Sequence, residues 1–366
     1  MQYNIISIVG ARPQFIKTSV VGSAFGQVPG VSHEVLHTGQ HYDEGMSAVF
    51  FREMRIREPA YNLGVGSGTH GQQTGRMLEA IEQVLMERRP DGVVVYGDTN
   101  STLAGAIAAQ KLRIPVAHVE AGLRSFNREM PEELNRVLTD HASDILFTPT
   151  DAASQNLERE GISKSKIFHT GDVMYDAALH YRPLAETQSR ILSSLSVKAG
   201  NYILATVHRA ENTDRFERLR SILSALAEVA KEISVIVPLH PRTRAKVNQP
   251  ALLKYLSKLR VIEPVGYFDM LVLEKNAAVI VTDSGGVQKE AYFQRVPCVT
   301  VRTETEWVEL VETGWNRLCN PEDAEFIQRT IRTARSTRGT ERELYGGGNA
   351  SNLIAQSFVN LLKATR

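Results

Sequence analysis

Three acidic side chains stand where strand-like runs end or a helix-like run begins. Asp98 follows GVVVYG, Glu120 follows PVAHV, and Glu132 opens the helical run in MPEELNR. The carboxyl ends of neighbouring parallel strands share one sheet edge, where ligands bind. Carboxylates held together repel one another, which raises the pKa of at least one and suits it to proton transfer. Each has a structural alternative by itself, such as Asp98 capping a helix. The three together favour an acid/base site.

Arg136 lies four residues after Glu132, on the same face of the expected helix. That spacing allows an ion pair between the two side chains. The alternative is an ordinary surface pair that contributes little to stability.

The first strand-to-helix turn carries cations. Its sequence is GARPQ, with Arg12 inside it and Lys17 about one helical turn further on. Free N–H groups at a helix N-terminus favour an anion, and an adjacent cation suits a phosphate. A solvated helix start is an equally good explanation of this motif by itself.

A later turn, TDSGGVQKE, combines glycines with a downstream carboxylate. Ser284, Gly285 and Gly286 follow a strand and open a helix, and Glu290 lies further along it. Glycines let a pyrophosphate approach the backbone, and Glu290 is placed to accept hydrogen bonds from a ribose diol. The alternative is a tight turn with a serine cap. The motif matches neither the dinucleotide fingerprint nor the P-loop, so neither NAD nor ATP is indicated.

Two histidines follow strands in the second half of the chain. His208 stands in TVHRAEN and His240 in PLHPR. Ten histidines occur, but no HExxH or Cys/His ligand spacing does, so no metal is predicted. We interpret His208 as a contact to a phosphate or leaving group.

Strand-like and helix-like runs alternate along the chain, which predicts βαβ units around parallel sheets. A first series occupies residues 3–160 and a second begins near Tyr202, with a polar stretch between them. We predict two Rossmann-like domains: residues 1–180, onto which the C-terminal helix 350–366 packs back, and residues 181–349. Ligands of open α/β sheets bind at the carboxyl ends of strands, so we expect the active site in the cleft between the domains.

Composition narrows the function further. The chain has 366 residues, a formal net charge of +1 and two cysteines, Cys298 and Cys319. A balanced charge gives no general attraction to nucleic acid or to a membrane surface. We expect a cytoplasmic protein, since there is no disulfide framework, signal peptide or transmembrane run.

Nine segments in order resemble the non-hydrolysing UDP-N-acetylglucosamine 2-epimerase family: GARPQFIK, TGQHYD, YGDTNSTLAGA, HVEAGLRS, MPEELNR, GDVMYDA, TVHRAEN, LHPRT and TDSGGVQKEA. The resemblance covers nearly the whole chain. It implies the glycosyltransferase-B-like fold of two Rossmann-like domains, a homodimer, a UDP-sugar substrate, and no cofactor or metal.

The family's chemistry inverts C2 of the sugar. A base removes the C2 proton while UDP leaves C1, and UDP then adds back to the glycal with a proton on the other face. By motif, the family's acid/base positions match Asp98, Glu120 and Glu132. Arg136 matches the partner of these carboxylates, and His208 matches the contact to the diphosphate or leaving group. The residues that match the UDP-binding positions are Arg12, Lys17, His208, Ser284, Gly285, Gly286 and Glu290.

The chain departs from the family pattern in two places. Trp307 follows Thr305-Glu306 where many relatives have Arg, and we expect Arg302 to supply that charge. The early loop has Asp43 where relatives with a second, activating UDP-sugar site have an Arg-Gln step. We therefore expect no activation by the substrate itself.

The segments RSFNREMPEELNR, EPVGYFDM, TEWVELVE and YGGGNAS resemble a narrower branch. It acts on UDP-2,3-diacetamido-2,3-dideoxy-glucuronate, made for O-antigen lipopolysaccharide or capsule. Both this sugar and UDP-N-acetylglucosamine stay open as substrates. A 6-carboxylate would need a cation, for which Arg124 or Arg128 is a candidate.

Three other functions are compatible with the same fold. A glycosyltransferase would share the UDP site but would have no use for three clustered carboxylates. A UDP-sugar sensor need not keep them together, and a hydrolysing relative would release free sugar and UDP.

Overall fold

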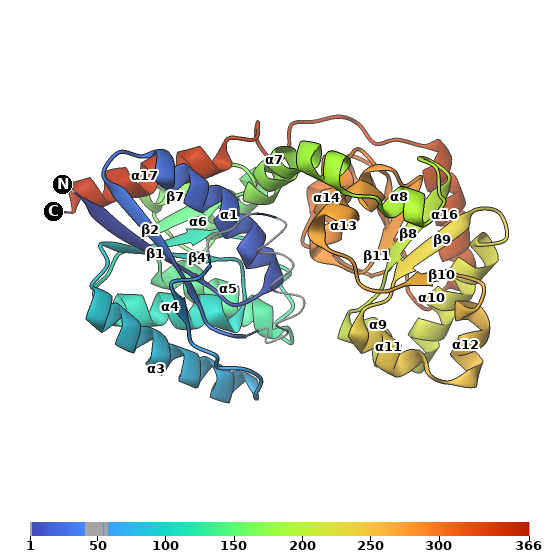
Figure 1. The fold of residues 1–366 in the computed structure, drawn as a ribbon, viewed down its shortest axis with the longest axis horizontal. Helices are drawn as coiled ribbons and strands as arrows, with labels where there is room; N and C mark the ends of the chain where they lie inside the picture. Colours follow the sequence, from blue (N-terminus) through green and yellow to red (C-terminus); the bar gives the residue numbers. More distant parts are fainter. Residues whose placement is uncertain (1, 41–53, 55–57, 366) are drawn as a thin grey trace. The chain divides into compact units, whose positions relative to one another are not determined.

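The computed structural model describes residues 2–40, 54 and 58–365, except the side chain of Arg12. The chain divides into two compact units, Met1–His180 with Glu343–Arg366, and Tyr181–Arg342 (Figure 1). It leaves the first unit, builds the second, and returns to the first.

The first unit contains a parallel sheet of order β3-β2-β1-β4-β5-β6-β7 in the described residues. Its strands are β1 (Tyr3–Val9), β2 (Val31–His37), β3 (Tyr61–Asn62), β4 (Gly92–Tyr96), β5 (Val116–Val119), β6 (Ile145–Thr148) and β7 (Ile167–His169). The runs of Val and Ile in β1 and β4 suit strands covered on both faces. Strand order reverses between β1 and β4, which is where a doubly wound sheet opens a crevice for ligands.

Helices cover this sheet and begin at recognisable signals. They are α1 (Arg12–Gln27), α3 (His70–Arg88), α4 (Asn100–Lys111), α5 (Pro131–Ala142), α6 (Asp151–Arg159), the 3₁₀ turn η1 (Lys164–Lys166), α7 (Val173–Gln188) and α17 (Ala350–Ala364). Thr99 caps α4 by accepting a hydrogen bond from the Thr102 amide. Pro131 occupies the first turn of α5, where its missing N–H costs nothing.

The C-terminal helix α17 packs on α1, as Figure 1 shows. The rings of Phe25 and Phe358 lie 6.5 Å apart with an edge-to-face tilt. Phe358 also lies against Gly92, where an added Cβ would collide with its ring. The last helix therefore completes the core of the first unit.

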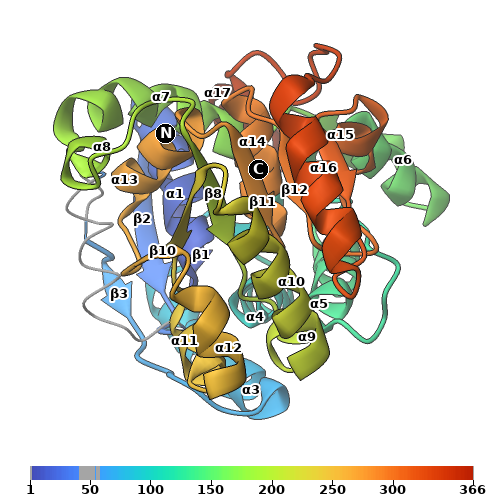
Figure 2. The same cartoon turned by 90° about the vertical axis from the view of Figure 1, so that its right-hand side faces the viewer.

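The second unit contains a parallel sheet of order β10-β9-β8-β11-β12-β13. The strands are β8 (Tyr202–Thr206), β9 (Ser234–Pro238), β10 (Arg260–Ile262), β11 (Val279–Thr282), β12 (Cys298–Thr300) and β13 (Asn316–Leu318). The helices are α8 (Ile191–Ser194), α9 (Ala210–Thr213), α10 (Phe216–Val229), α11 (Pro241–Val247), α12 (Pro250–Leu256), α13 (Tyr267–Lys275), α14 (Gly285–Phe293), α15 (Val308–Glu312) and α16 (Ala324–Ser336). Figure 2 shows α10 and α16 side by side, and their Leu219, Ile222, Ile327 and Ile331 share one core cluster.

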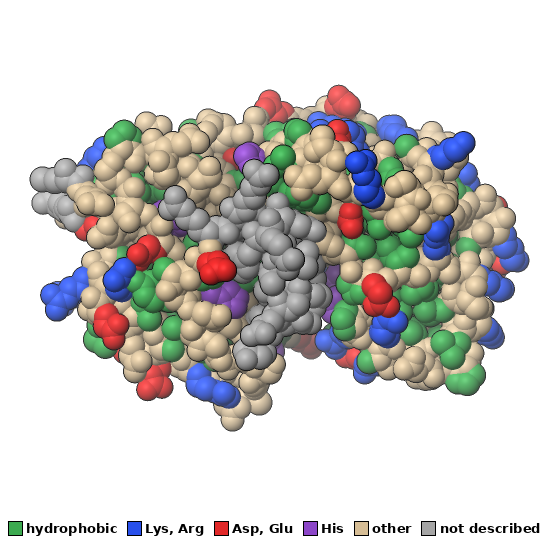
Figure 3. All heavy atoms as spheres, in the orientation of Figure 1, with side chains coloured by type: hydrophobic (Ala, Val, Ile, Leu, Met, Phe, Trp, Pro, Cys, Tyr) green, Lys and Arg blue, Asp and Glu red, His purple; other side chains and the backbone are tan. Residues whose placement is uncertain are grey.

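All the strand pairings in both sheets are parallel, which confirms the predicted α/β class. Charged side chains of both signs are interspersed over the face drawn in Figure 3, in keeping with the net charge of +1. Within the part of the chain that the structure describes, no helix has the length and apolarity to cross a bilayer.

Candidate functional site

The first unit has a pocket of about 280 Å³ at the carboxyl ends of β1 and β4. It is lined by Ala11, Pro13, Gln14, Lys17, Gln40, His70, Tyr96, Gly97, Asp98, Thr99, Asn100, Pro131, Glu132 and Asn135. The pocket lies at the point where the strand order reverses, the usual place for a ligand in such a sheet.

Gln14 ties the two loops of this pocket together. Its side-chain oxygen accepts hydrogen bonds from the amides of Gly10, at 2.7 Å, and Ala11, at 3.0 Å. Its side-chain nitrogen donates to the Tyr96 carbonyl at 2.7 Å and to Thr99 Oγ1 at 3.0 Å. The loop after β1 is thus fixed against the loop after β4. No local sequence signal predicted this role of Gln14.

Lys17 and Glu120 form a buried ion pair. Lys17 Nζ contacts Glu120 Oε2, and their side chains are 7% and 11% exposed. Glu120 follows β5 with a φ of 71°, a left-handed conformation that costs about 1–3 kcal/mol in a residue with a Cβ. The amides of Glu120 and Ala121 both donate to the Phe147 carbonyl, at 3.1 and 3.0 Å, and hold the turn in place.

Asp98 pairs with Arg136 across the same pocket. Asp98 Oδ2 lies 2.7 Å from Arg136 Nη2, and Glu133 Oε2 lies 3.4 Å from Arg136 Nη1. Glu132 is exposed in the first turn of α5 and lines the pocket. Arg136 thus forms ion pairs with Asp98 and Glu133, and the predicted pairing with Glu132 stays a prediction.

The three predicted carboxylates come to one edge of the sheet. Asp98 and Glu132 line the pocket. A Cβ built on the pocket residue Gly97 would lie 3.4 Å from both Glu120 Oε2 and Lys17 Nζ. Arg12 opens α1 beside this edge, and its side chain is outside the described part of the structure. The same holds for Asp43 in the early loop.

A buried charge network lies behind the pocket. Asp140 of α5 contacts His118 Nδ1 and Arg124 Nη1, each at 2.7 Å. Arg124 also binds Glu160 through two hydrogen bonds of 2.7 Å. The Arg124 side chain is 1% exposed, so its charge is already used and it is no free partner for a substrate carboxylate. Arg128, the other candidate cation, is exposed.

In the second unit Asp283 organises the loop after β8. Its carboxylate accepts hydrogen bonds from the amides of His208 and Arg209, at 3.0 Å, and from Asn212 Nδ2, at 3.0 Å. Asp283 is fully buried, while the His208 side chain is 36% exposed. The loop is therefore fixed by its backbone, and the imidazole of His208 stays accessible.

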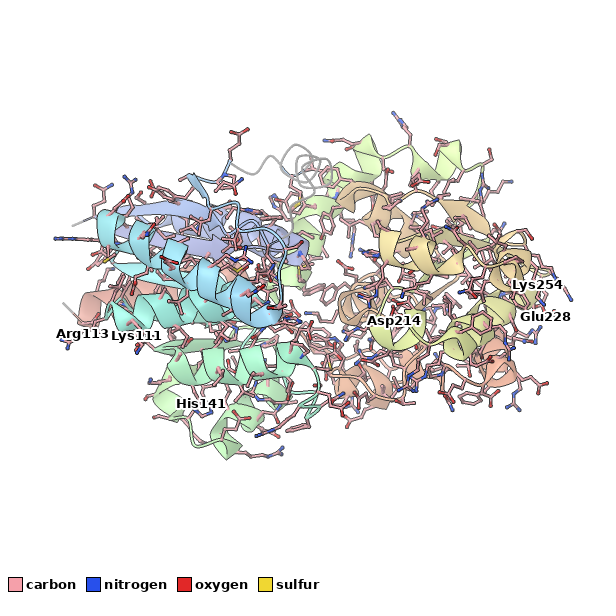
Figure 4. The ribbon with its side chains drawn as sticks, turned by 90° about the horizontal axis from the view of Figure 1, so that it is seen from below. Lys111, Arg113, His141, Asp214, Glu228 and Lys254 are labelled. Carbon is pink, nitrogen blue, oxygen red and sulfur yellow. The ribbon has the colours of Figure 1, made fainter. Side chains whose placement is uncertain are left out.

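His208 stacks on His240, with ring centroids 5.1 Å apart. His240 Nδ1 accepts a hydrogen bond of 3.1 Å from the Arg242 amide and so caps α11. Asp214, labelled in Figure 4, links the end of α9 to α11 through Arg242, at 2.7 Å, and Lys246, at 3.0 Å. These cations hold the pKa of Asp214 below its ordinary value. The two histidine loops are thus joined.

Ser284 follows β11 directly before α14, and Gly285 and Gly286 begin the first turn of that helix. Ser284 is the N-cap residue, and its side chain makes no capping hydrogen bond. An added Cβ on Gly285 would collide with Glu306 Oε1. Glu306 in turn pairs with Arg302 at 3.0 Å and Arg209 at 3.7 Å. A carboxylate therefore lies against the glycine turn, which is the kind of group that a helix N-terminus favours.

Arg302 and Trp307 have separate roles. Arg302 is buried and its Nη1 binds Glu306. The Trp307 ring lies 4.2 Å from Lys289 Nζ, in cation–π geometry. Arg302 therefore binds Glu306, the carboxylate that lies against Gly285.

Glu290, in α14, has a fully buried acidic neighbour, Glu274 of α13. Burial raises the pKa of Glu274 well above its ordinary value, and the nearby charge of Glu290 raises it further. Burial at this position therefore favours the protonated form of Glu274. Nothing in the sequence predicted a role for Glu274, because a helical Glu is normally solvated.

The fold and the site define a doubly wound α/β protein. Polar residues gather in the loops where the strand order of each sheet reverses, between β1 and β4 in the first unit and between β8 and β11 in the second. In the described ranges, no three His, Cys, Asp or Glu side chains gather in a way that could hold a metal ion.

The family model described as UDP-N-acetylglucosamine 2-epimerase matches residues 23–359. The chain is 52% identical over 361 residues to a UDP-N-acetylglucosamine 2-epimerase homolog of Methanococcus maripaludis, covering 98% of this chain and 99% of the relative. It is 49% identical over 360 residues to the UDP-2,3-diacetamido-2,3-dideoxy-D-glucuronate 2-epimerase of Pseudomonas aeruginosa, covering 98% and 99%.

Solved structures agree. The Methanocaldococcus jannaschii UDP-GlcNAc 2-epimerase in complex with UDP-GlcNAc and UDP is 44% identical, with a TM-score of 0.90 over 98% of this chain and 100% of that one. A glycosyltransferase from Rickettsia africae, at 13% identity, a TM-score of 0.54 and coverage of 99% and 94%, shares the fold alone. The chain belongs to the UDP-N-acetylglucosamine 2-epimerase family. It is an isomerase of the epimerase kind, as the resemblance predicted.

Proposed function

We propose that the chain is a non-hydrolysing epimerase that inverts C2 of a UDP-2-acetamido sugar by elimination and re-addition of UDP. The observation that carries the proposal is the pairing of two carboxylates with cations at one sheet edge, Asp98 with Arg136 and Glu120 with Lys17. A reaction that removes a proton from one face and returns one to the other needs two such groups.

In the first half of the reaction the C2–H and C1–O bonds break, a C1=C2 double bond forms, and the carboxylate base takes the proton. In the second half an acid returns a proton to the opposite face of C2, and UDP oxygen re-forms the bond to C1. We assign the proton transfers to Asp98, Glu120 and Glu132, with Arg136 stabilising Asp98. The C2 proton is not acidic by itself, so stabilisation of the departing diphosphate must lower much of the barrier.

We assign UDP binding to Arg12, Lys17, His208, Ser284, Gly285, Gly286 and Glu290. The partly exposed imidazole of His208 and the side chain of Ser284, which makes no capping hydrogen bond, support this assignment. Glu290 is half-buried in α14 and suits a ribose diol. Because Lys17 forms a buried ion pair with Glu120, a residue proposed to bind phosphate contacts one proposed to transfer a proton.

For the substrate we propose UDP-2,3-diacetamido-2,3-dideoxy-glucuronate ahead of UDP-N-acetylglucosamine, in O-antigen or capsule synthesis. The supporting observation is the 49% identity to the Pseudomonas aeruginosa enzyme. Arg128 is then the candidate cation for the 6-carboxylate, since Arg124 is committed to Asp140 and Glu160.

The test is proton NMR of the enzyme in D₂O with each nucleotide sugar in a separate tube. Deuterium at C2, a manno-configured signal and UDP still attached would support epimerisation, and the tube that reacts identifies the substrate. Arg128→Ala should slow only the uronate. Free UDP with free sugar would instead indicate a hydrolase, and no exchange with bound UDP would indicate a glycosyltransferase or a sensor.

We also propose that the enzyme is a cytoplasmic homodimer. Leu134 and Leu138 lie one turn apart on α5, 58% and 44% exposed, and Phe126 is 74% exposed in the preceding loop. A second copy would cover such an apolar group. Light scattering on a sizing column should give twice the chain mass for the wild type and the single mass for Leu134→Glu. Fractionation of cells would test the location.

A further inference from the structure

His118, in β5, is fully buried between two hydrogen-bond acceptors. Its Nδ1 lies 2.7 Å from Asp140 Oδ1, and its Nε2 lies 2.7 Å from the Gly97 carbonyl oxygen. Both distances are short enough for charge-assisted hydrogen bonds. A neutral imidazole carries only one N–H, so it could satisfy only one of these acceptors.

The Gly97 carbonyl can only accept, which places a proton on Nε2. Asp140 is surrounded by donors on its other oxygen, with the Gly122 amide at 3.1 Å and Arg124 Nη1 at 2.7 Å. Burial acts to raise the pKa of Asp140, but the charges and hydrogen bonds of His118 and Arg124 outweigh it and lower that pKa. Asp140 is therefore ionised and accepts from Nδ1, so both ring nitrogens carry protons.

The charges around the ring balance. The titratable groups that contact His118 or its partner are Asp140 and Arg124, and Arg124 continues to Glu160. With an imidazolium, two cations meet two carboxylates. With a neutral ring, the buried Asp140 would share the charge of Arg124 with Glu160, whose side chain is 27% exposed.

Gly97 is the point through which His118 reaches the pocket. Its carbonyl binds His118 Nε2 and its amide donates to the Val119 carbonyl at 3.0 Å. It has a φ of 65°, it precedes Asp98, and an added Cβ would lie 3.4 Å from Glu120 Oε2. A shift of this turn would therefore move Asp98 relative to Glu120.

We propose that His118 is a positioning residue, held as a buried imidazolium that clamps the Gly97–Asp98 turn beside the Lys17–Glu120 pair. This rests on the proposed function, in which Asp98 and Glu120 transfer protons. His118 touches neither the substrate nor the reacting atoms in this proposal.

The charge state is tested on the wild-type protein labelled with ¹⁵N-histidine, with the His118 signals assigned by their loss in His118→Gln. We expect imidazolium chemical shifts for both ring nitrogens at pH 7.5. A neutral tautomer at pH 7.5 would overturn the proposal. This reading needs no substrate, so it stands apart from any failure of the proposed reaction.

The positioning role is tested with two substitutions that each keep one donor. The amide of His118→Gln matches the reach of Nε2 toward Gly97, and that of His118→Asn matches Nδ1 toward Asp140. We expect His118→Asn to lower kcat about 10- to 100-fold, the size of a lost charge-assisted hydrogen bond. His118→Gln should lose markedly less, and KM should change about twofold or less in both.

His141→Gln is the matched control, because His141 is 47% exposed at the end of α5 and contacts the network only through Glu160, at 3.4 Å (Figure 4). It should keep kcat within about twofold. Equal losses of kcat in His118→Gln and His118→Asn would contradict the clamp on Gly97. If neither variant folds, single substitutions of the other nine histidines assign the His118 signals by elimination, and the ¹⁵N spectrum of the wild type decides. An inactive wild type with the expected spectrum would refute the proposed function and leave the imidazolium intact.

Discussion

Lys17 Nζ binds Glu120 Oε2 in an ion pair that joins α1 to the end of β5. The two residues are 103 positions apart, so this contact depends entirely on the fold. Sequence reasoning assigned Lys17 to a phosphate and Glu120 to proton transfer. Their contact means that the cation also sets the charge environment of the carboxylate, so a change at Lys17 affects proton transfer as well as phosphate binding.

Lys17→Met should destabilise the first unit by about 3 kcal/mol, because it leaves a buried carboxylate without its counter-ion. Adding Glu120→Gln should restore much of that loss. Both tryptophans, Trp307 and Trp315, lie in the second unit, so urea unfolding followed by far-UV circular dichroism should shift while tryptophan fluorescence does not. Equal stability of Lys17→Met and wild type would show that the pair contributes nothing.

Glu120→Gln should bind UDP with wild-type affinity and lose at least about 100-fold in turnover, the usual contribution of a general acid or base. The amide keeps the shape of the side chain but cannot take a proton. Calorimetry with UDP and the D₂O exchange assay measure the two effects separately. Turnover near wild type would remove Glu120 from the proton-transfer group.

Gly285→Ala should weaken UDP binding about tenfold, because the methyl group would occupy the surface that a diphosphate approaches and would push Glu306 aside. Gly286→Ala should have a smaller effect, since an added Cβ there would find its nearest atom, Ser284 Oγ, 3.9 Å away. Both changes lie at the start of α14, so their melting temperatures should agree. Calorimetry with UDP that ranks the two variants the other way round would contradict this.

Glu274→Gln should make the second unit less sensitive to alkaline pH. The pKa of Glu274 is raised above its ordinary value of 4.5 by burial and by Glu290, so folded chains hold a proton that unfolded chains release. Its contribution to stability is present below about pH 4.5 and is lost as the pH rises through the folded pKa. The stability of the variant relative to wild type should therefore rise by up to about 1.4 kcal/mol per pH unit in that window.

Urea unfolding of both proteins at several pH values, followed by tryptophan fluorescence, measures this difference. Parallel stability curves for Glu274→Gln and wild type would show that Glu274 is ionised in the folded chain.

The sequence predicted the α/β class because its strands are apolar runs that need no tertiary information, such as GVVVY in β4. It also predicted that Asp98 and Glu120 follow neighbouring strands, and β4 does pair with β5. It did not predict β2, whose first four residues are polar or only half-buried. It also left out α3, although Met77, Ile81 and Leu85 are buried at four-residue spacing, a readable helical signal.

The details of the site were harder to predict because they depend on long-range pairing. Nothing local indicates that Arg124 turns inward to Asp140 and Glu160, or that Glu306 lies against Gly285. Burial of charge is rare, so sequence reasoning favours solvent for such side chains. Within the described residues, the tertiary placement of the loops decides which carboxylate pairs with each of these cations, and this placement cannot be inferred from local sequence.

The return of α17 to α1 has a consequence for how the protein is made. Phe358 fills space beside Gly92 and Phe25, so the first sheet lacks part of its cover until the last helix has left the ribosome. The second unit, by contrast, is one uninterrupted stretch, Tyr181–Arg342. It can therefore fold during synthesis, before α17 is available to complete the core of the first unit.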